Sequence, residues 1–421
     1  MTGKLRIAVV GAGPAGLAIA IELKKLPFVE YTLYERNDRI SEIGAGISIQ
    51  QTTWRMLEVM GAAQHLRDST WFRPEDGHSV RHYNGRTGRL LSTRYQPNVP
   101  KEFLHARCHR AELQNALWKA NDPGHIRTSK RLTNISQLPS GRVRLQFADG
   151  FVDEVDLLVG ADGIRSVVRS FAFPEHKIAY TGRTVYRTLI PVEEVRCIEG
   201  LPADAVAFWH APKGEWVYTC NLGGKDFELT VMTNEPLTEH EKERVSWGEP
   251  ANVSDMTRHF PNFFRPIQEL FAITPDIKRY AAFSGPRLQS VVTDSNNIAL
   301  IGDASHPLSG AFGSGAGFAL EDAYTLTQSL RWAFARDRSK PQLGDALHLF
   351  DRVRSPHYEK LYRVLDGFKE VAGNLAAPHL QLNSDEEVAV LVAMNWAKRH
   401  DWIYEYDITQ DFARIAEQES D

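Results

Sequence analysis

Three short, mostly apolar segments of the chain are each followed by a turn that contains glycine. Leu5–Val10 leads into Gly11, Asp156–Gly160 leads into a second turn, and Asn297–Ile301 leads into Gly302. Apolar runs of this length, with little polar alternation, are typical of strands that are buried on both faces. The pattern therefore predicts an α/β protein with a glycine-containing loop after each of three strands.

The first turn has the sequence GAGPAG, which gives the spacing G-x-G-x-x-G between a predicted strand and a predicted helix. Gly11 allows the tight turn, Gly13 lets the backbone approach a pyrophosphate, and Gly16 lets the helix pack closely on the strand. Glu35 ends the next predicted strand, where a ribose-binding carboxylate belongs and where it would repel a 2′-phosphate. We interpret the turn as a dinucleotide site that excludes NADP, with Arg36 flanking the adenosine.

The second and third turns each place an aspartate at the end of a predicted strand, Asp162 in GADG and Asp303 in GDASHP. Asp162 could serve a flavin pyrophosphate or a visiting nicotinamide nucleotide, and Asp303 could accept hydrogen bonds from ribityl hydroxyls. A helix predicted to begin near Gly315 would direct its positive N-terminal end at the flavin N1/C2 carbonyl. Three Gly/Asp turns in this order indicate a chain wrapped around a flavin dinucleotide, with Gly46 and Ser48 as further contacts.

The pattern of apolar and polar residues changes between the second and third turns. Alternating, aromatic-rich segments predict a mostly antiparallel sheet over 181–287, and helical periodicity dominates after the third turn. We therefore expect the first part of the cofactor domain over 1–180, its second part with long helices over 288–366, and a helical tail over 367–421.

Size and charge exclude several classes of function. The chain has 421 residues, 43% hydrophobic and 24% charged, and a net charge of −4, which gives no electrostatic case for nucleic acid. No apolar run approaches the roughly 20 residues that a membrane-spanning helix needs, and the N-terminus leads directly into the first predicted strand. The three cysteines lack metal-ligand spacing. We expect a cytoplasmic protein with no metal site and no stable membrane insertion.

The three turns and their order resemble the single-component FAD-dependent aromatic hydroxylases, the class of salicylate and para-hydroxybenzoate hydroxylases. The likeness covers about residues 5–360 and includes Glu35, an H-R-x-x-L helix opening at His109, the D-G turn at Asp162 and the G-D-A-x-H-P segment at Gly302. It implies a Rossmann-like FAD-binding domain with an inserted, mostly antiparallel β-sheet substrate domain and C-terminal helices.

The resemblance also implies cofactor contacts and a reaction. Arg110, Asp303 and the backbone near Gly315 and Ala316 would hold FAD, and Asp162 would serve both the flavin and NAD(P)H. In this class NAD(P)H reduces FAD, O2 forms a flavin C4a-hydroperoxide, and a phenolate ring carbon attacks its distal oxygen. The implied partners are a small phenolic substrate, O2 and NAD(P)H. The choice between NADH and NADPH is open, and a homodimer is one of the open oligomeric states.

Two residues of the inserted sheet are candidates for binding the phenolate, which needs a fixed positive charge and hydrogen-bond donors in a dry pocket. Arg187 lies on one predicted strand and Tyr218 on a neighbouring one. By resemblance to fungal enzymes that dearomatise polyketide phenols, such an Arg/Tyr pair binds the substrate oxygen. The alternatives are a surface salt bridge for Arg187 and a core aromatic for Tyr218. His210 is expected to be a structural histidine.

Several functions stay open at this point. The segment 309–317 resembles the dearomatising enzymes, which favours oxidative dearomatisation, whereas the chain as a whole also fits a salicylate-type hydroxylase of a simple aromatic acid. A flavin-dependent reductase or dehydrogenase and a non-catalytic FAD-binding scaffold are further alternatives. A flavoprotein halogenase is disfavoured, because no W-x-W-x-I-P segment occurs.

Overall fold

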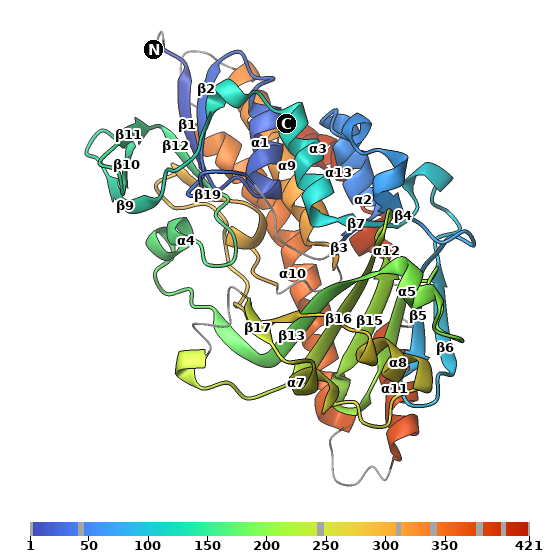
Figure 1. The fold of residues 1–421 in the computed structure, drawn as a ribbon. Coiled ribbons are helices and arrows are strands. Elements are labelled where there is room, and N and C mark those ends of the chain that lie inside the picture. The colour runs from blue at the N-terminus through green and yellow to red at the C-terminus, as the bar shows by residue number, and fades with distance from the viewer. Residues whose placement is uncertain are drawn as a thin grey trace.

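A five-stranded parallel sheet forms the upper half of the molecule in Figure 1. The structure is a computed structural model, and it describes residues 3–40, 46–241, 248–308, 313–336, 343–375, 382–396 and 401–419. The predicted strands before the three turns are neighbours in this sheet. In spatial order its strands are β19 (Ile298–Leu300), β12 (Leu157–Gly160), β1 (Leu5–Val10), β2 (Val29–Tyr34) and β8 (Ile126–Arg127).

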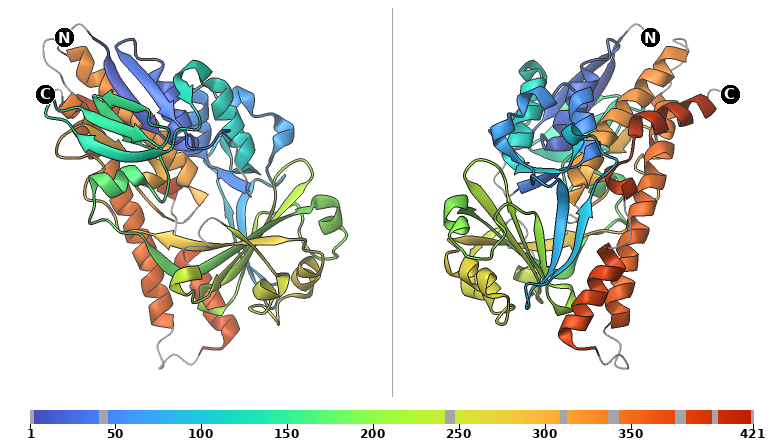
Figure 2. Two further views of the ribbon diagram at one scale, coloured as in Figure 1. Left: turned by 60° about the vertical axis from the view of Figure 1, so that its left-hand side comes forward. Right: turned by 90° about the vertical axis from the view of Figure 1, so that its right-hand side faces the viewer.

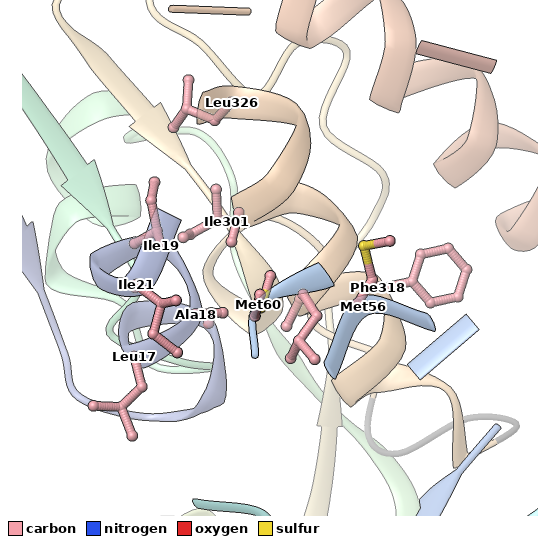
Figure 3. Packing of buried hydrophobic residues seen from close by; sticks show 14 of the residues in the cluster. Leu17, Ala18, Ile19, Ile21, Met56, Met60, Ile301, Phe318 and Leu326 are labelled. Atoms are coloured by element: carbon pink, nitrogen blue, oxygen red, sulfur yellow. The ribbon is translucent and has the colours of Figure 1, made fainter. Parts of the chain in front are cut away.

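Helices pack against this sheet and bury a large apolar core. Apart from Glu22, helix α1 (Pro14–Leu23) has no charged residue, and it packs between the sheet and α9 (Gly315–Arg336). Figure 3 shows Leu17, Ile19 and Ile21 of α1 in the same cluster as Ile301 beside β19 and Phe318 and Leu326 of α9. The helices α2 (Gln51–Val59) and α3 (Arg110–Ala120) add to this core.

A second, eight-stranded sheet forms the lower half of the molecule. All its pairs are antiparallel except β14 with β5, which are parallel. Its strands in order are β17 (Glu249–Ala251), β18 (Ile277–Ser284), β13 (Ala179–Pro191), β16 (Asp226–Asn234), β15 (Trp216–Asn221), β14 (Ala207–His210), β5 (His78–Asn84) and β6 (Leu90–Tyr95).

This sheet draws on more of the chain than the expected span 181–287. The hairpin β5–β6 comes from the segment that the sequence assigned to the cofactor domain, yet β5 pairs in register with β14. The sheet therefore has two strands that precede its other six in sequence by a long stretch of the cofactor domain.

The two faces of the large sheet are covered differently. On one face, α5 (Val192–Arg196), α7 (Val253–Thr257) and α8 (Arg265–Ala272) enclose an apolar cluster that includes Trp209, Phe227 and Val231. On the opposite side, α11 (Ser384–Trp396) contacts β5 and β6, and the long helix α10 (Leu343–Leu375) packs against α11, as Figure 2 shows from the side. Phe208 of β14 stacks on Trp396 of α11, with ring centroids 5.7 Å apart, so α11 covers the face on which Phe208 lies.

The remaining elements are small. One three-stranded sheet consists of β9 (Leu132–Gln137), β10 (Val143–Phe147) and β11 (Val152–Val155), and another of β3 (Gly46–Ile49), β7 (Ala106–His109) and β4 (Trp71–Phe72). The short helices are α4 (Val167–Ala172), α12 (Asp401–Tyr404) and α13 (Ile408–Gln418). In the described ranges, no helix has an apolar stretch long enough to cross a bilayer.

A buried polar network ties the third turn to α9 and α10. One carboxylate oxygen of Asp322 accepts hydrogen bonds from the Gly302 amide at 2.8 Å and from His306 Nε2 at 3.0 Å. The other accepts from Arg354 Nε at 2.8 Å and from the Tyr358 hydroxyl. Burial alone would raise the pKa of Asp322, but Arg354 and these hydrogen bonds hold it at about 2. The loop at Gly302 is therefore fixed by a carboxylate that stays ionised.

We expect Asp322→Asn to lower the free energy of unfolding by about 3 kcal/mol, because the buried Arg354 would keep only Glu321 as an acidic partner, and burial raises the pKa of Glu321 to about 7. Urea denaturation measures this loss. The matched control is Asp366→Asn, whose ion pair with Lys369 is exposed on α10 and whose loss should change stability by less than about 0.5 kcal/mol. Equal effects of the two variants would contradict the structural role of Asp322.

Candidate functional site

The three turns predicted from the sequence meet at one edge of the parallel sheet. In the strand register, Val10 stands opposite Gly160, and Gly160 stands opposite Leu300. The Ala161 amide donates to the Val10 carbonyl at 2.9 Å, and the Ile301 amide donates to the Gly160 carbonyl at 3.0 Å. The loops that follow β1, β12 and β19 are thus neighbours at the carboxyl ends of their strands, where ligands of open α/β sheets bind.

Each glycine of the first turn is required, or allowed, for a different structural reason. Gly11 has φ +102°, and a Cβ there would lie 2.5 Å from the Ala161 carbonyl oxygen. A Cβ on Gly16 would lie 1.8 Å from the Gly11 carbonyl oxygen, so this glycine lets α1 approach the turn. A Cβ on Gly13 would meet nothing within 4 Å. Gly13 therefore leaves open space beside the N-terminus of α1, which fits the approach of a pyrophosphate.

Glu35 lies at the end of β2 and braces this turn. Its carboxylate accepts hydrogen bonds from the backbone amides of Ala12 and Asn37, both at 2.9 Å. The side chain is buried, whereas Arg36 beside it is exposed. Glu35 is therefore placed at the turn where a ribose would lie, with two backbone partners that the sequence did not predict.

The Asp162 carboxylate is directed at a helix N-terminus. It accepts hydrogen bonds from the Ser166 hydroxyl and from the amides of Val167 at 2.7 Å and Val168 at 3.2 Å, at the start of α4. Burial raises the pKa of this carboxyl group, and the hydrogen bonds act against the shift. The protein itself thus engages the side chain that the sequence assigned to a cofactor. Gly163, with φ +77° and open space around it, leaves the backbone of this turn accessible.

Asp303 has a different environment. Its side chain is exposed, and within the described residues its carboxylate has no hydrogen-bond partner. Its Oδ1 atom would lie 3.9 Å from a Cβ on Gly315, so the carboxylate stands beside the first residue of α9. Arg169 stabilises the turn by donating hydrogen bonds to the backbone carbonyls of Asp303 at 3.2 Å and Ala304 at 3.0 Å. An exposed acceptor at this position suits the hydroxyls of a ribityl chain.

The strand β3 carries Ser48 against the segment that precedes α9, and it carries Gly46 against the side chains of Glu228 and Arg107. A Cβ on Gly313 would lie 3.0 Å from Ser48 Oγ. Ser48 is buried and accepts a hydrogen bond from Arg107 at 2.8 Å, and Ala316 in the first turn of α9 is buried as well. Gly44 and the segment 309–312, on which the likeness to the dearomatising enzymes partly depends, lie outside the described residues.

The two substrate candidates share one face of the large sheet. Arg187 on β13 stands opposite Thr230 on β16, and Thr230 stands opposite Tyr218 on β15. Tyr218 in turn stands opposite Phe208 on β14, and their ring centroids are 4.7 Å apart. Because directly opposed residues point to the same face of a sheet, Arg187 and Tyr218 lie in one row, two strand spacings or roughly 10 Å apart.

Arg187 has no partner of its own in this row. The side chain is half-buried, its Nε atom is buried without a hydrogen bond, and no described residue forms an ion pair with it. Burial lowers the pKa of its guanidinium, Glu228 raises it, and Arg110 and Arg107 lower it. The described residues therefore do not form the surface salt bridge that was the alternative for Arg187. A desolvated cation without a partner is suited to bind an anion.

Tyr218 lies beneath a cation that the sequence analysis did not identify. The guanidinium carbon of Arg107 is 5.2 Å from the centroid of the Tyr218 ring. Burial raises the pKa of the Tyr218 hydroxyl well above its usual value, so the phenol stays protonated and able to donate. Arg107 is itself ion-paired with Glu228 of β16, and both side chains are buried. No local spacing could have revealed this pair, because the two residues are 121 positions apart.

The aromatic side chains on the strands next to Tyr218 divide between the two faces of the sheet. Phe208 and Trp216 pack with Tyr218, whereas Trp209 and Phe227 belong to the apolar cluster on the opposite face. His210 Nε2 is 2.9 Å from His82 Nδ1, and burial lowers the pKa of His210 to about 3. A neutral, hydrogen-bonded His210 agrees with the structural role expected for it. No described group of three His, Cys, Asp or Glu side chains could hold a metal ion.

Comparison with known proteins agrees with this geometry. The model of a family described as FAD binding domain matches residues 4–361. The chain is 28% identical over 362 residues to a 3-amino-4-hydroxybenzoate 2-monooxygenase of Streptomyces platensis, covering 85% of the chain and 86% of that relative. It is 25% identical over 433 residues to a dual trans-enoyl reductase/FAD-dependent monooxygenase of Aspergillus terreus, covering 96% of the chain but only 60% of the longer relative.

The fold is that of salicylate hydroxylase. The structure of a salicylate hydroxylase substrate complex superposes with a TM-score of 0.79 at 22% identity and covers 99% of this chain and 98% of the other. The resemblance to FAD-dependent aromatic hydroxylases and the predicted fold class are thereby confirmed.

The open space at Gly13 generates a prediction about cofactor binding. Gly13→Ala should fold with nearly unchanged stability, because the added Cβ would meet no protein atom. It should bind FAD at least tenfold more weakly, because the Cβ would occupy space that faces the pyrophosphate. Flavin absorbance per protein and thermal unfolding measure the two effects. Gly16→Ala is the matched control and should lose stability itself, since its Cβ would overlap the Gly11 carbonyl. Full flavin occupancy in Gly13→Ala would disprove the assignment.

Proposed function

The chain belongs to the FAD-binding domain family, and on this premise we propose that the protein is an FAD-dependent monooxygenase that uses O2 and NAD(P)H to hydroxylate a small phenolic substrate. The observation that carries the proposal is the row on the large sheet, in which Tyr218 shares one face with Arg187, a cation that forms no ion pair with any described residue. The relatives named above, which are monooxygenases, support the reaction class.

The residues of the three turns fit FAD. The open side of Gly13 would receive the pyrophosphate at the N-terminus of α1, Glu35 would lie near the ribose, and Asp303 would accept from ribityl hydroxyls. Gly315, Ala316, Gly46 and Ser48 would line the flavin end, with Arg110 at the start of α3. Bound FAD would supply electron transfer from NAD(P)H and the activation of O2.

The chain's own residues would select the ionised form of the substrate. The Arg187 guanidinium would bind the phenolate oxygen, and the Tyr218 hydroxyl would donate a hydrogen bond to the same oxygen. Both interactions favour the anion, and an ionised oxygen makes the ring carbons more electron-rich and so more reactive toward an electrophilic oxygen. Phe208 and the apolar residues around Tyr218 would exclude water from this end of the site.

The orientation of the ring decides which product forms. With an unsubstituted carbon toward the reacting oxygen, the product keeps its aromatic ring; with a substituted carbon there, the product is a quinol-type dienone. We propose both salicylate-type phenol acids and polyketide-derived phenols as substrate classes to test, because the site offers one anion anchor and apolar surroundings.

The proposal is tested by measuring NADH, NADPH and O2 consumption by the purified yellow protein across a panel of small phenols, with mass spectra of the products. We expect at least one phenol to stimulate consumption and to gain one oxygen atom, and loss of aromatic absorbance would identify dearomatisation. If reduced nicotinamide is consumed without oxygen incorporation into any phenol, the protein is a reductase or dehydrogenase and the proposal is wrong.

Arg187→Ala should retain bound FAD but raise the KM for the phenol by roughly 10- to 100-fold, which corresponds to the loss of a charged hydrogen bond of about 1.5–3 kcal/mol. Arg187→Lys should recover part of this loss. The matched control is Arg279→Gln on the adjacent strand β18, because Arg279 is already paired with Glu249. Unchanged KM in Arg187→Ala would remove Arg187 from the substrate site.

A further inference from the structure

Glu228 is a buried carboxylate near two arginines, Arg187 on the same face of the sheet and Arg107 on β7, outside the sheet. It lies on β16 two positions before Thr230, and Thr230 stands directly opposite Arg187. The Thr230 hydroxyl donates to Glu228 Oε1 at 2.9 Å. Glu228 is 2% exposed. Burial alone would raise the pKa of its carboxyl group, but Arg107 and, to a smaller extent, Arg187 lower it. The carboxylate is therefore ionised and within the electrostatic reach of both guanidinium groups.

In the structure, the Glu228 carboxylate is ion-paired with Arg107. Arg107 on β7 forms an ion pair with Glu228 Oε2, donates from its other terminal nitrogen to Ser48 Oγ at 2.8 Å, and stacks over the Tyr218 ring. The Cys220 thiol completes the surroundings of Glu228 Oε2 at 3.5 Å. Among the described residues, Arg187 forms no ion pair with Glu228, although both lie on the same face.

We propose that Arg107 is a positioning residue that holds Glu228 away from Arg187 and thereby leaves the Arg187 charge available to an anionic substrate. The inference rests on the proposed function, in which Arg187 binds the phenolate. It assigns to Arg107 a role through Glu228 rather than contact with the substrate. It also explains why an acidic side chain can be tolerated on the face of the sheet that must attract an anion.

The physical reason is a competition for one carboxylate. Two arginines and one glutamate share a region where unpaired charge is costly, so the arginine that does not hold Glu228 is left to pair with a ligand. Without the Arg107 guanidinium, Arg187 would be the cation closest to Glu228 on this face of the sheet, and an arginine side chain is long enough to reach a diagonal neighbour in a sheet. An internal Arg187–Glu228 pair would then occupy the substrate anchor.

The test uses Arg107→Met, Glu228→Gln and the double variant, with Arg144→Gln as a control in an exposed ion pair of the small sheet. Dissociation constants for the best phenol of the panel are measured from the change in flavin absorbance on titration. We expect Arg107→Met to bind the phenol at least tenfold more weakly, Glu228→Gln to bind it no more weakly than the wild type, and the double variant to return to within about threefold of the wild type. A purely structural role of Arg107 gives no such rescue, so a double variant as weak as Arg107→Met would overturn the proposal.

Crystal structures provide a measurement that does not depend on a phenol. Soaks in sodium bromide, located by anomalous scattering, should show bromide at Arg187 in the wild type and the double variant, and Glu228 in contact with Arg187 in Arg107→Met. This pattern without turnover of any phenol would reject the proposed function but support the competition for Glu228. Bromide absent from Arg187 in the wild type, or Glu228 remaining apart from Arg187 in Arg107→Met, would overturn the inference. If Arg107→Met does not fold, weakened phenol binding by Glu228→Gln overturns it.

Discussion

The parallel pairing of β1, β12 and β19 is the constraint on which the candidate site depends. Three loops separated by long stretches of chain become neighbours only because their strands are adjacent and point the same way. Each loop then needs its own support behind it. Glu35 braces the first, Ser166 and α4 fix the second, and the ionised Asp322 anchors the third. A flat, extended ligand requires such an edge, since no single loop is long enough to hold it.

The large sheet differs from the loop edge of the parallel sheet in that its two faces have different chemistry. One face carries the apolar cluster beneath α7 and α8, whereas the other carries Arg187, Glu228 and Tyr218 among aromatic side chains. Arg107 comes from β7, outside the sheet, and pairs with the Glu228 carboxylate, which would be costly to bury without a cation. The face that carries Arg187 and Tyr218 is thus joined to the β3–β7 region by an ion pair as well as by packing.

The sequence predicted the features whose cause is local. Gly11 and Gly16 could be identified because a turn and a close helix contact impose their spacing, and Arg187 and Tyr218 could be placed on strands by alternation. The sequence did not reveal that Asp162 caps α4, although Ser166 in front of a short helix is a capping signal. Arg107 and Glu228 were missed because only the tertiary fold brings them together.

The hairpin β5–β6 has a consequence for how this architecture can be rearranged. Because β5 completes the large sheet from an early part of the chain, the half of the molecule built on this sheet is not a continuous stretch that could be exchanged between relatives as one piece. A chimera that transferred only 181–287 would leave β14 paired with a foreign strand and His210 beside a foreign partner in place of His82. New specificity in such a protein is therefore more readily reached by changing individual side chains on the sheet face than by recombining segments.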